Sequence, residues 1–238
     1  MSVVALIPAA GRGTRMGGER PKQFLPLAGS PMLAKTLGVF QRAAAVDEIV
    51  VMVPPGEEAY CREAIVDRYG FSKVRTVLAG GATRQASVAA GLSVLGREVS
   101  IVVIHDGARP FVSDDLIGRV IEAARTTGAA IAALPIVDTL KQVHEGRAVT
   151  VEREGLWAAQ TPQAFRREVI CAAVERALAD GFGGTDDAAL VERLGLPVVL
   201  VEGHPANFKI TRIGDLEMAE EMAALRDRAA GAPSGAIN

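Results

Sequence analysis

Short apolar runs rich in β-branched residues recur along the chain and alternate with stretches in which apolar residues have helical spacing. The runs lie at residues 3–7, 49–53, 74–78, 101–104 and 130–134. Apolar runs of this length, without polar alternation, are typical of strands that are buried on both faces of a sheet. The alternation of strands and helices predicts an α/β fold with a mostly parallel sheet.

The intervening segments carry the punctuation of helices. Pro31 precedes one such segment, residues 57–69 follow the turn Pro54-Pro55-Gly56, and Ser113 can cap the next helix. Later in the chain we expect helices at 166–179 and 185–194, a strand at 198–201 and a last helix from about 214 to 228. The whole pattern predicts a Rossmann-like sheet with helices on both faces.

The regular alternation breaks after Pro135. The stretch VDTLKQVHEGRAVTVER contains two short alternating runs around Glu145-Gly146, which predicts a β-hairpin at about 136–154. A long two-stranded ribbon is not stable alone, so it must lie on the sheet or on another subunit. The small number of large apolar residues in its flanks favours the second possibility. We therefore expect a protruding β-hairpin arm that joins two copies into a homodimer.

Length and composition suit one main domain. A chain of 238 residues with 49% hydrophobic content can bury a sizeable core. We expect a single domain over 1–225, which includes the arm, and a frayed C-terminal tail over 226–238, where the residues are small and weakly patterned.

Charge and cysteine usage narrow the class of protein. A formal net charge of -2 gives no global field that would recruit nucleic acid or an anionic membrane. Cys61 and Cys171 match no metal-ligand spacing and are expected to be buried reduced thiols. The sequence shows no leader-like segment and no apolar run near the ~20 residues of a bilayer span. These features predict a cytoplasmic protein.

The loop after the first strand, PAAGRGTRMGGERPKQF at residues 8–24, is rich in glycine and in basic residues. It is not a dinucleotide fingerprint, because Met16 stands where the third glycine is needed. A P-loop is also excluded, because Lys22 is followed by Gln23 rather than by Ser or Thr.

What remains is a long loop whose glycines permit close backbone approach and whose basic side chains, Arg12, Arg15, Arg20 and Lys22, supply charge. Backbone donors combined with guanidinium groups suit a polyphosphate. The alternative is a surface loop whose arginines face water. The position at the carboxyl end of a strand favours a ligand site.

Six further blocks carry a resemblance to a known family. They are GGATRQASVAAGL at 80–92, IHDGARPFV at 104–112, DTLK at 138–141, QTPQAF at 160–165, TDDAAL at 185–190 and NFKIT at 207–211. Together with the opening loop they resemble the nucleotidyltransferases, and among them the family of 2-C-methyl-D-erythritol 4-phosphate cytidylyltransferases. The resemblance covers residues from about 3 to about 225.

The resemblance implies an enzyme that transfers CMP from CTP to 2-C-methyl-D-erythritol 4-phosphate, with release of pyrophosphate, in the non-mevalonate route to isoprenoid precursors. It also implies Mg²⁺ or a similar divalent cation as cofactor. Ribitol 5-phosphate or another polyol phosphate stays open as the acceptor. A uridylyl or guanylyl transferase and a nucleotide-sugar-binding regulator without turnover also stay open as functions.

The nucleophile of this reaction would be a phosphate monoester with a second pKa of about 6, which needs no general base near neutral pH. Positioning and electrostatic stabilisation therefore carry the catalysis. The resemblance implies that Arg15 and Lys22 are a catalytic pair, with Lys22 on the α-phosphate, and that Lys209 approaches the same phosphate from the other side.

The resemblance also implies a CTP site in two parts of the chain. Its residues are Pro8, Ala9, Ala10, Gly11, Gly13, Gly80, Gly81, Arg84 and Ser87. The second group would form a cytosine pocket, in which glycines let the backbone reach the base and the serine hydroxyl donates to it. A tight strand-to-helix turn would explain the same glycines.

Asp106 follows a predicted strand at its carboxyl end, where a carboxylate can hold a magnesium ion that bridges phosphates. The resemblance implies that Asp106 also contacts the acceptor and that Arg109 orients it. Thr161 and, from the partner subunit's arm, Thr139 and Arg153 are the remaining implied acceptor-binding residues. Arg153 could instead pair with a neighbouring glutamate.

The three histidines are isolated and form no zinc site. His105 stands at a strand end, where a hydrogen bond to a neighbouring loop is expected. His144 and His204 are expected in exposed structural or neutral positions.

Overall fold

The computed structural model describes residues 2–11 and 21–231. The strands are β1 (Ser2–Pro8), β2 (Pro26–Leu27), β3 (Ser30–Pro31), β4 (Glu48–Val53), β5 (Val74–Ala79), β6 (Val99–Ile104), β7 (Ala129–Pro135), β8 (Leu140–His144), β9 (Arg147–Val151), β10 (Trp157–Arg166) and β11 (Val199–Glu202). The helices are the short η2 (Lys22–Phe24), α1 (Met32–Arg42), α2 (Glu58–Cys61), its continuation η3 (Arg62–Asp67), α3 (Arg84–Ser93), α4 (Asp114–Thr127), α5 (Arg167–Ala179), α6 (Asp187–Glu192) and α7 (Ile213–Gly231).

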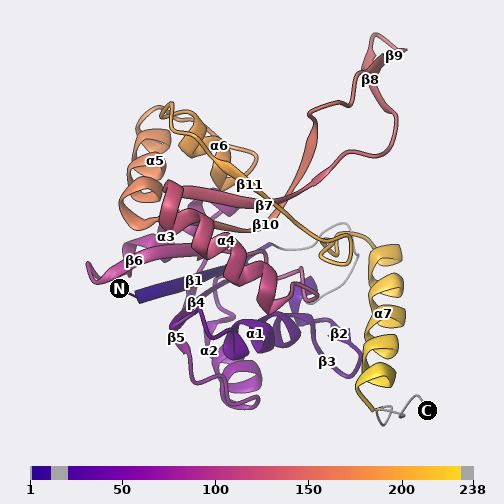
Figure 1. Ribbon diagram of the computed structural model, residues 1–238. Coiled ribbons are helices and arrows are strands. Elements are labelled where there is room, and N and C mark those ends of the chain that lie inside the picture. Colours follow the sequence, from indigo (N-terminus) through magenta and orange to yellow (C-terminus); the bar gives the residue numbers. More distant parts are fainter. Residues whose placement is uncertain (1, 12–20, 232–238) are drawn as a thin grey trace, which may run out of the picture.

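The centre of the molecule is a seven-stranded sheet in the order β11-β7-β10-β6-β1-β4-β5 (Figure 1). The pairs β6·β1, β1·β4, β4·β5 and β11·β7 are parallel. All six strands predicted for the sheet are present. The prediction of an α/β, Rossmann-like and mostly parallel sheet is confirmed.

One central strand, β10, was not predicted. It runs antiparallel between β6 and β7 and pairs with both. Its pairing with β7 is irregular between Ala159 and Gln163, so residues 160–162 leave the regular ladder. A search for apolar runs misses this strand because several of its residues are polar. The proline in it also argues against a central strand, because a proline cannot donate a hydrogen bond to the ladder.

Helices cover both faces of the sheet, as predicted. On one face Leu37 and Phe40 of α1 and Leu116 and Val120 of α4 belong to the larger buried cluster. On the other face α3, α5 and α6 build a second cluster, which includes Val88, Ile170 and Leu190. Ser113 caps α4 as expected, because its hydroxyl accepts a hydrogen bond from the Leu116 amide.

A third, smaller cluster lies under α7. Leu27, Phe111 and Ile210 are buried in it together with Ala219 and Ala223 of the helix. Helix α7 therefore fastens the β2–β3 turn to the segments before α4 and before α7. The helix extends to Gly231, past the residue at which the single domain was expected to end.

Strands β8 and β9 form the predicted hairpin, which projects away from the sheet (Figure 1). Val143 and Val149 on it are 61% and 60% exposed, so the ribbon buries little apolar surface against its own subunit. Within residues 2–11 and 21–231, no helix has both the length and the apolar character that crossing a bilayer requires.

Candidate active site

A cavity of about 720 Å³ opens at the carboxyl ends of β1, β4, β5 and β6. In open α/β sheets ligands bind at this edge. It is lined by Pro8, Ala9, Ala10, Gly11, Lys22, Gln23, Pro54, Pro55, Gly80, Gly81, Ala82, Thr83, Arg84, Ser87, Asp106, Gly107, Ala108, Lys209 and Thr211. The structure thus brings together most of the residues that the sequence assigned to CTP and to catalysis. Gly13 and Arg15 lie outside the described residues.

The turn at Gly80 and Gly81 is packed so closely that a side chain could not be added. A Cβ on Gly80 would lie 2.3 Å from the Cβ of Ala10, and one on Gly81 would lie 2.4 Å from the Cβ of Ala86. Both glycines are therefore required by local packing. They also line the cavity, so a tight turn at these glycines is compatible with the expected ligand site.

Ser87 stabilises this turn. Its hydroxyl donates to the Thr83 carbonyl at 3.0 Å and accepts from the Gly81 amide at 3.0 Å. The single hydroxyl proton is thus used within the protein, so in this rotamer the Ser87 oxygen can only accept a further hydrogen bond, whereas a donor was expected from the sequence.

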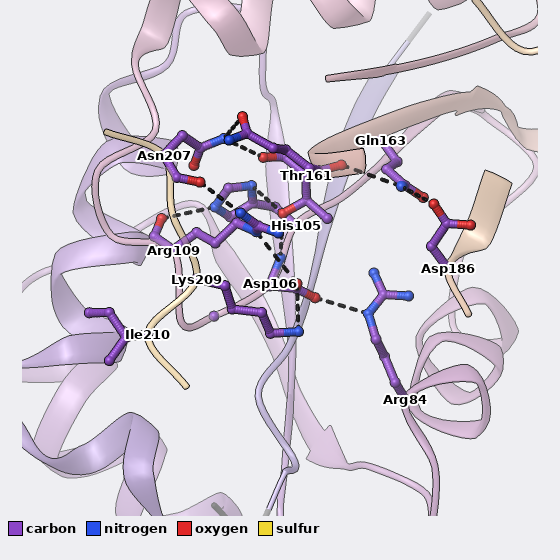
Figure 2. A network of polar contacts seen from close by, with 12 residues as sticks. Arg84, His105, Asp106, Arg109, Thr161, Gln163, Asp186, Asn207, Lys209 and Ile210 are labelled. Carbon is purple, nitrogen blue, oxygen red and sulfur yellow. Dashed lines mark hydrogen bonds and ion pairs between the residues drawn. The ribbon is translucent and has the colours of Figure 1, made fainter. Parts of the chain in front are cut away.

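Asp106 lies at the centre of a network of charges, which Figure 2 shows together with its partners. Its Oδ1 accepts from Arg84 Nε at 2.9 Å, and its Oδ2 lies 2.8 Å from Lys209 Nζ. Burial alone would raise the pKa of this carboxyl, but Arg84 and Lys209 outweigh burial and hold the pKa of Asp106 well below its usual range. Asp106 is therefore ionised throughout the physiological range.

Arg84 bridges two carboxylates. Besides Asp106, it contacts Asp187, whose Oδ2 lies 2.8 Å from Arg84 Nη2 and whose side chain is 1% exposed. Burial raises the pKa of Asp187, and Arg84 opposes this shift. Asp187 was missed as a site residue, although it lies in the TDDAAL block. Because Arg84 is held by two carboxylates, its guanidinium is fixed beside Asp106 at the wall of the two cavities.

The two lysines of the cavity come from opposite ends of the chain. The Lys22 ammonium donates to the carbonyl of Ile210 at 2.8 Å. Ile210 is the residue that directly follows Lys209 in the sequence. The Ile210 amide in turn donates to the Ala108 carbonyl at 2.9 Å. The segments that carry Lys22, Lys209 and Asp106 are thus joined to one another.

His105 is fully buried and fixes the start of the loop that follows β6 and carries Asp106 and Arg109. Its Nε2 lies 3.0 Å from the Arg109 carbonyl, which can only accept, so Nε2 carries the proton. Its Nδ1 accepts from the Thr161 hydroxyl at 3.1 Å, and that hydroxyl accepts from the Asp106 amide at 3.1 Å. Burial lowers the pKa of His105 to about 4, so the ring is neutral. The expected structural role of His105 agrees with these contacts.

A second cavity of about 220 Å³ adjoins the first, and both are lined by Arg84, Asp106 and Lys209. The other residues that line it are Arg109, Ala159, Gln160, Thr161, Gln163, Thr185 and Asp186. Two predicted acceptor-binding residues, Arg109 and Thr161, are thus placed beside Lys209. Sequence reasoning missed Gln163, which donates to Asp186 at 2.8 Å and anchors the start of α6.

The remaining predicted acceptor residues, Thr139 and Arg153, lie at the base of the arm and line neither cavity. Both are exposed, and the Arg153 guanidinium donates to the Val137 carbonyl, across the base of the hairpin. A pairing of Arg153 with a neighbouring glutamate is absent among the contacts of the described residues. If these two residues bind an acceptor, they do so away from the cavities of their own subunit.

Comparison with known proteins identifies the family of the chain. The family model IspD, 2-C-methyl-D-erythritol 4-phosphate cytidylyltransferase, matches residues 3–225. A relative of that name from Geobacter metallireducens is 52% identical over 224 residues, which cover 92% of this chain and 97% of the relative. The chain belongs to this family.

Solved structures of family members have the same fold. The 2-C-methyl-D-erythritol 4-phosphate cytidylyltransferase of Thermus thermophilus is 42% identical, with a TM-score of 0.79 over 94% of this chain and all of that one. The 4-diphosphocytidyl-2C-methyl-D-erythritol synthase of Anaerococcus prevotii has a TM-score of 0.82 at 32% identity, covering 94% of this chain and 96% of the other. Membership of the 2-C-methyl-D-erythritol 4-phosphate cytidylyltransferase family makes the chain an enzyme of the nucleotidyltransferase class.

Proposed function

We propose that this protein transfers CMP from CTP to 2-C-methyl-D-erythritol 4-phosphate and releases pyrophosphate, as a step in the formation of isoprenoid precursors. The observation that carries the proposal is the pair of lysines, Lys22 and Lys209, in one cavity beside Asp106. Cations set around an ionised carboxylate suit a reaction between two phosphates, because they offset the charge of both.

The acceptor phosphate oxygen attacks the α-phosphorus of CTP, and the bond between that phosphorus and the oxygen bridging to the β-phosphate breaks. Lys22 and Lys209 stabilise the charge that develops on the α-phosphate and on the leaving pyrophosphate. Arg15 is proposed to join them from the opening loop. The dianionic acceptor needs no proton removed, so the mechanism requires no general base.

The cytosine lies, in this proposal, on the turn formed by Gly80 and Gly81, against Pro8, Ala9 and Ala10. The main chain of Gly11 and Gly13 then approaches the triphosphate. Ser87 accepts a hydrogen bond from the cytosine amine, because its own proton is held by Thr83. A uracil presents a carbonyl at that position and would be left without a donor.

Mg²⁺ is the proposed cofactor. Within the described residues, no group of three or more His, Cys, Asp or Glu side chains could form a dedicated cage. Mg²⁺ is commonly held by one or two carboxylates together with substrate phosphates, and Asp106 is an ionised carboxylate that lines both cavities. The ion, when bound, neutralises charge on the triphosphate.

The acceptor is proposed to occupy the smaller cavity, between Asp106, Arg109 and Thr161. Thr139 and Arg153 of a second subunit would close that cavity over the acceptor phosphate, since a guanidinium is suited to a phosphate dianion. The protein therefore acts as a homodimer in this proposal.

Pyrophosphate release tests the proposal. The purified protein is incubated with Mg²⁺, CTP and each of 2-C-methyl-D-erythritol 4-phosphate and ribitol 5-phosphate, then with UTP and GTP in place of CTP. Release with CTP and the methylerythritol phosphate alone supports the proposal. Faster release with ribitol 5-phosphate would replace the acceptor, and faster release with another nucleotide would replace the donor.

A further inference from the structure

Arg109 carries a buried nitrogen without a hydrogen-bond partner. Its Nε has none among the described residues and lies 3.6 Å from Asp106 Oδ2, too far for a hydrogen bond. The same guanidinium is anchored at its other end, where Nη1 donates to the Asn207 carbonyl at 2.7 Å. A buried unsatisfied donor is costly and calls for an explanation.

The oxygen that Arg109 faces is occupied by a partner able to leave. Lys209 Nζ contacts Asp106 Oδ2 at 2.8 Å, and the Lys209 side chain is 36% exposed, against 27% for Arg84 and 12% for Arg109. Arg84 is held on Oδ1 and also by the buried Asp187. Of the three cations around Asp106 in the described part of the chain, Lys209 is therefore the one able to move toward a phosphate.

We propose that Arg109 is a positioning residue for nucleotide binding. Lys209 leaves Asp106 Oδ2 for the CTP phosphates, and the Arg109 Nε–H takes its place on that oxygen. The inference rests on the proposed function, since it assumes that Lys209 binds phosphate. It gives Arg109 a role that does not require the acceptor. Arg109 does not line the larger cavity, so it would affect nucleotide binding through Asp106 rather than by contact with the nucleotide.

The exchange keeps Asp106 paired on both oxygens. Without Arg109, the departure of Lys209 would leave one oxygen of a carboxylate that is 8% exposed without a cationic side chain, so that only the bound Mg²⁺ could pair it. Losing a hydrogen bond to a charged group corresponds to about a ten- to hundredfold change in an equilibrium constant. Without Arg109, CTP binding would be weaker by that factor.

Isothermal titration of Mg²⁺ and CTP, without acceptor, tests this role. We expect Arg109→Met to weaken CTP binding about ten- to a hundredfold. In a D106N background there is no carboxylate that the departure of Lys209 could leave unpaired, so Arg109→Met should cause no further loss. Arg119→Met is the matched control, because Arg119 pairs with Asp115 on the surface and should not alter binding.

The outcomes separate the inference from the proposed function. No binding by the wild-type protein, or undiminished binding by Lys209→Met, would overturn both. Weakened binding by Lys209→Met together with unchanged binding by Arg109→Met would overturn the inference alone. An equal loss from Arg109→Met in the presence and absence of the Asp106 charge would also overturn it.

A second measurement avoids the risk that Arg109→Met fails to fold. In wild-type protein labelled with ¹⁵N at arginine Nε, the Arg109 signal is assigned by its absence in Arg109→Lys. Addition of Mg²⁺ and CTP should shift this Nε–H signal downfield and slow its exchange with water. An unchanged signal under saturating CTP would refute the exchange.

Discussion

The Lys22 ammonium donates to the main-chain carbonyl of Ile210 at 2.8 Å, which joins positions 188 residues apart in the sequence. This contact sets the first lysine of the cavity beside the segment that carries the second, Lys209. Lys22 and the segment before α7 therefore meet at the same edge of the cavity, and in the proposed mechanism Lys22 has both a structural and a catalytic role.

The structural and the catalytic roles of Lys22 can be measured separately. Lys22→Ala should lower kcat/KM for CTP by about 10² to 10³, the usual cost of removing a group that stabilises transition-state charge. The loss of the hydrogen bond from the Lys22 ammonium should reduce the free energy of unfolding by about 2 kcal/mol, which leaves the protein folded. Lys73→Ala is the matched control, because Lys73 also donates to a carbonyl at 2.8 Å but does not line the cavity. Near-normal turnover in Lys22→Ala would remove Lys22 from the mechanism.

Protein stability should fall as the pH is lowered from about 6.5 to about 4, because of His105. The pKa of this ring is about 4 in the folded protein and 6.5 as its ordinary value, so the unfolded chain binds more protons in that window. The contribution amounts to about 3 kcal/mol across the window.

Urea unfolding at pH 7.0 and 4.5 checks this expectation. His105→Asn should be less stable than wild type at pH 7.0 but should lose less stability between the two pH values. Equal losses in both proteins would show that His105 does not cause the pH dependence. The neighbouring Asp106, with a lowered pKa, adds its own loss only below its ordinary pKa of 3.8.

The buried pair of Asp187 and Arg84 should be important for stability. Asp187→Asn removes a carboxylate that is 1% exposed and leaves the guanidinium with Asp106 alone. We expect a loss of about 3 kcal/mol in the free energy of unfolding, since breaking a buried ion pair is expensive. Asp115→Asn, at a 75% exposed carboxylate paired with Arg119, should change stability by no more than about 0.5 kcal/mol. Similar effects of the two substitutions would contradict a structural role for the buried pair.

The strands of the sheet could be predicted because apolar runs such as 49–53 and 101–104 are buried on both faces and need no tertiary information. Strand β10 could not, because Gln160, Thr161 and Gln163 owe their burial to polar partners from distant segments. Gln163 is satisfied by Asp186 and by the amides of α6, and Gln160 by the segment near His204. Periodicity does not record such pairing.

The residues of the candidate site likewise fall into a predicted group and a group that the sequence did not predict. The glycines and lysines of the cavity were visible as local patterns or through the family resemblance. The arrangement of Asp187, Arg84 and Asp106 was not, because it depends on the approach of α6 to α3 across the second face of the sheet. The pKa shifts of Asp106 and Asp187 depend on that approach. They could not be predicted because a sequence pattern contains no distances between distant segments.

The arm offers the final prediction, that each site uses Arg153 from the partner subunit. Lys22→Ala and Arg153→Gln should each be nearly inactive as homodimers. If Arg153 acts across the dimer, mixed dimers of the two variants contain one site with an intact Lys22 from one chain and an intact Arg153 from the other. Co-expression should then restore activity that neither variant has, whereas an Arg153 that served its own subunit would give no restoration. Light scattering on the wild-type protein provides the control, since an active monomer would rule out a shared site.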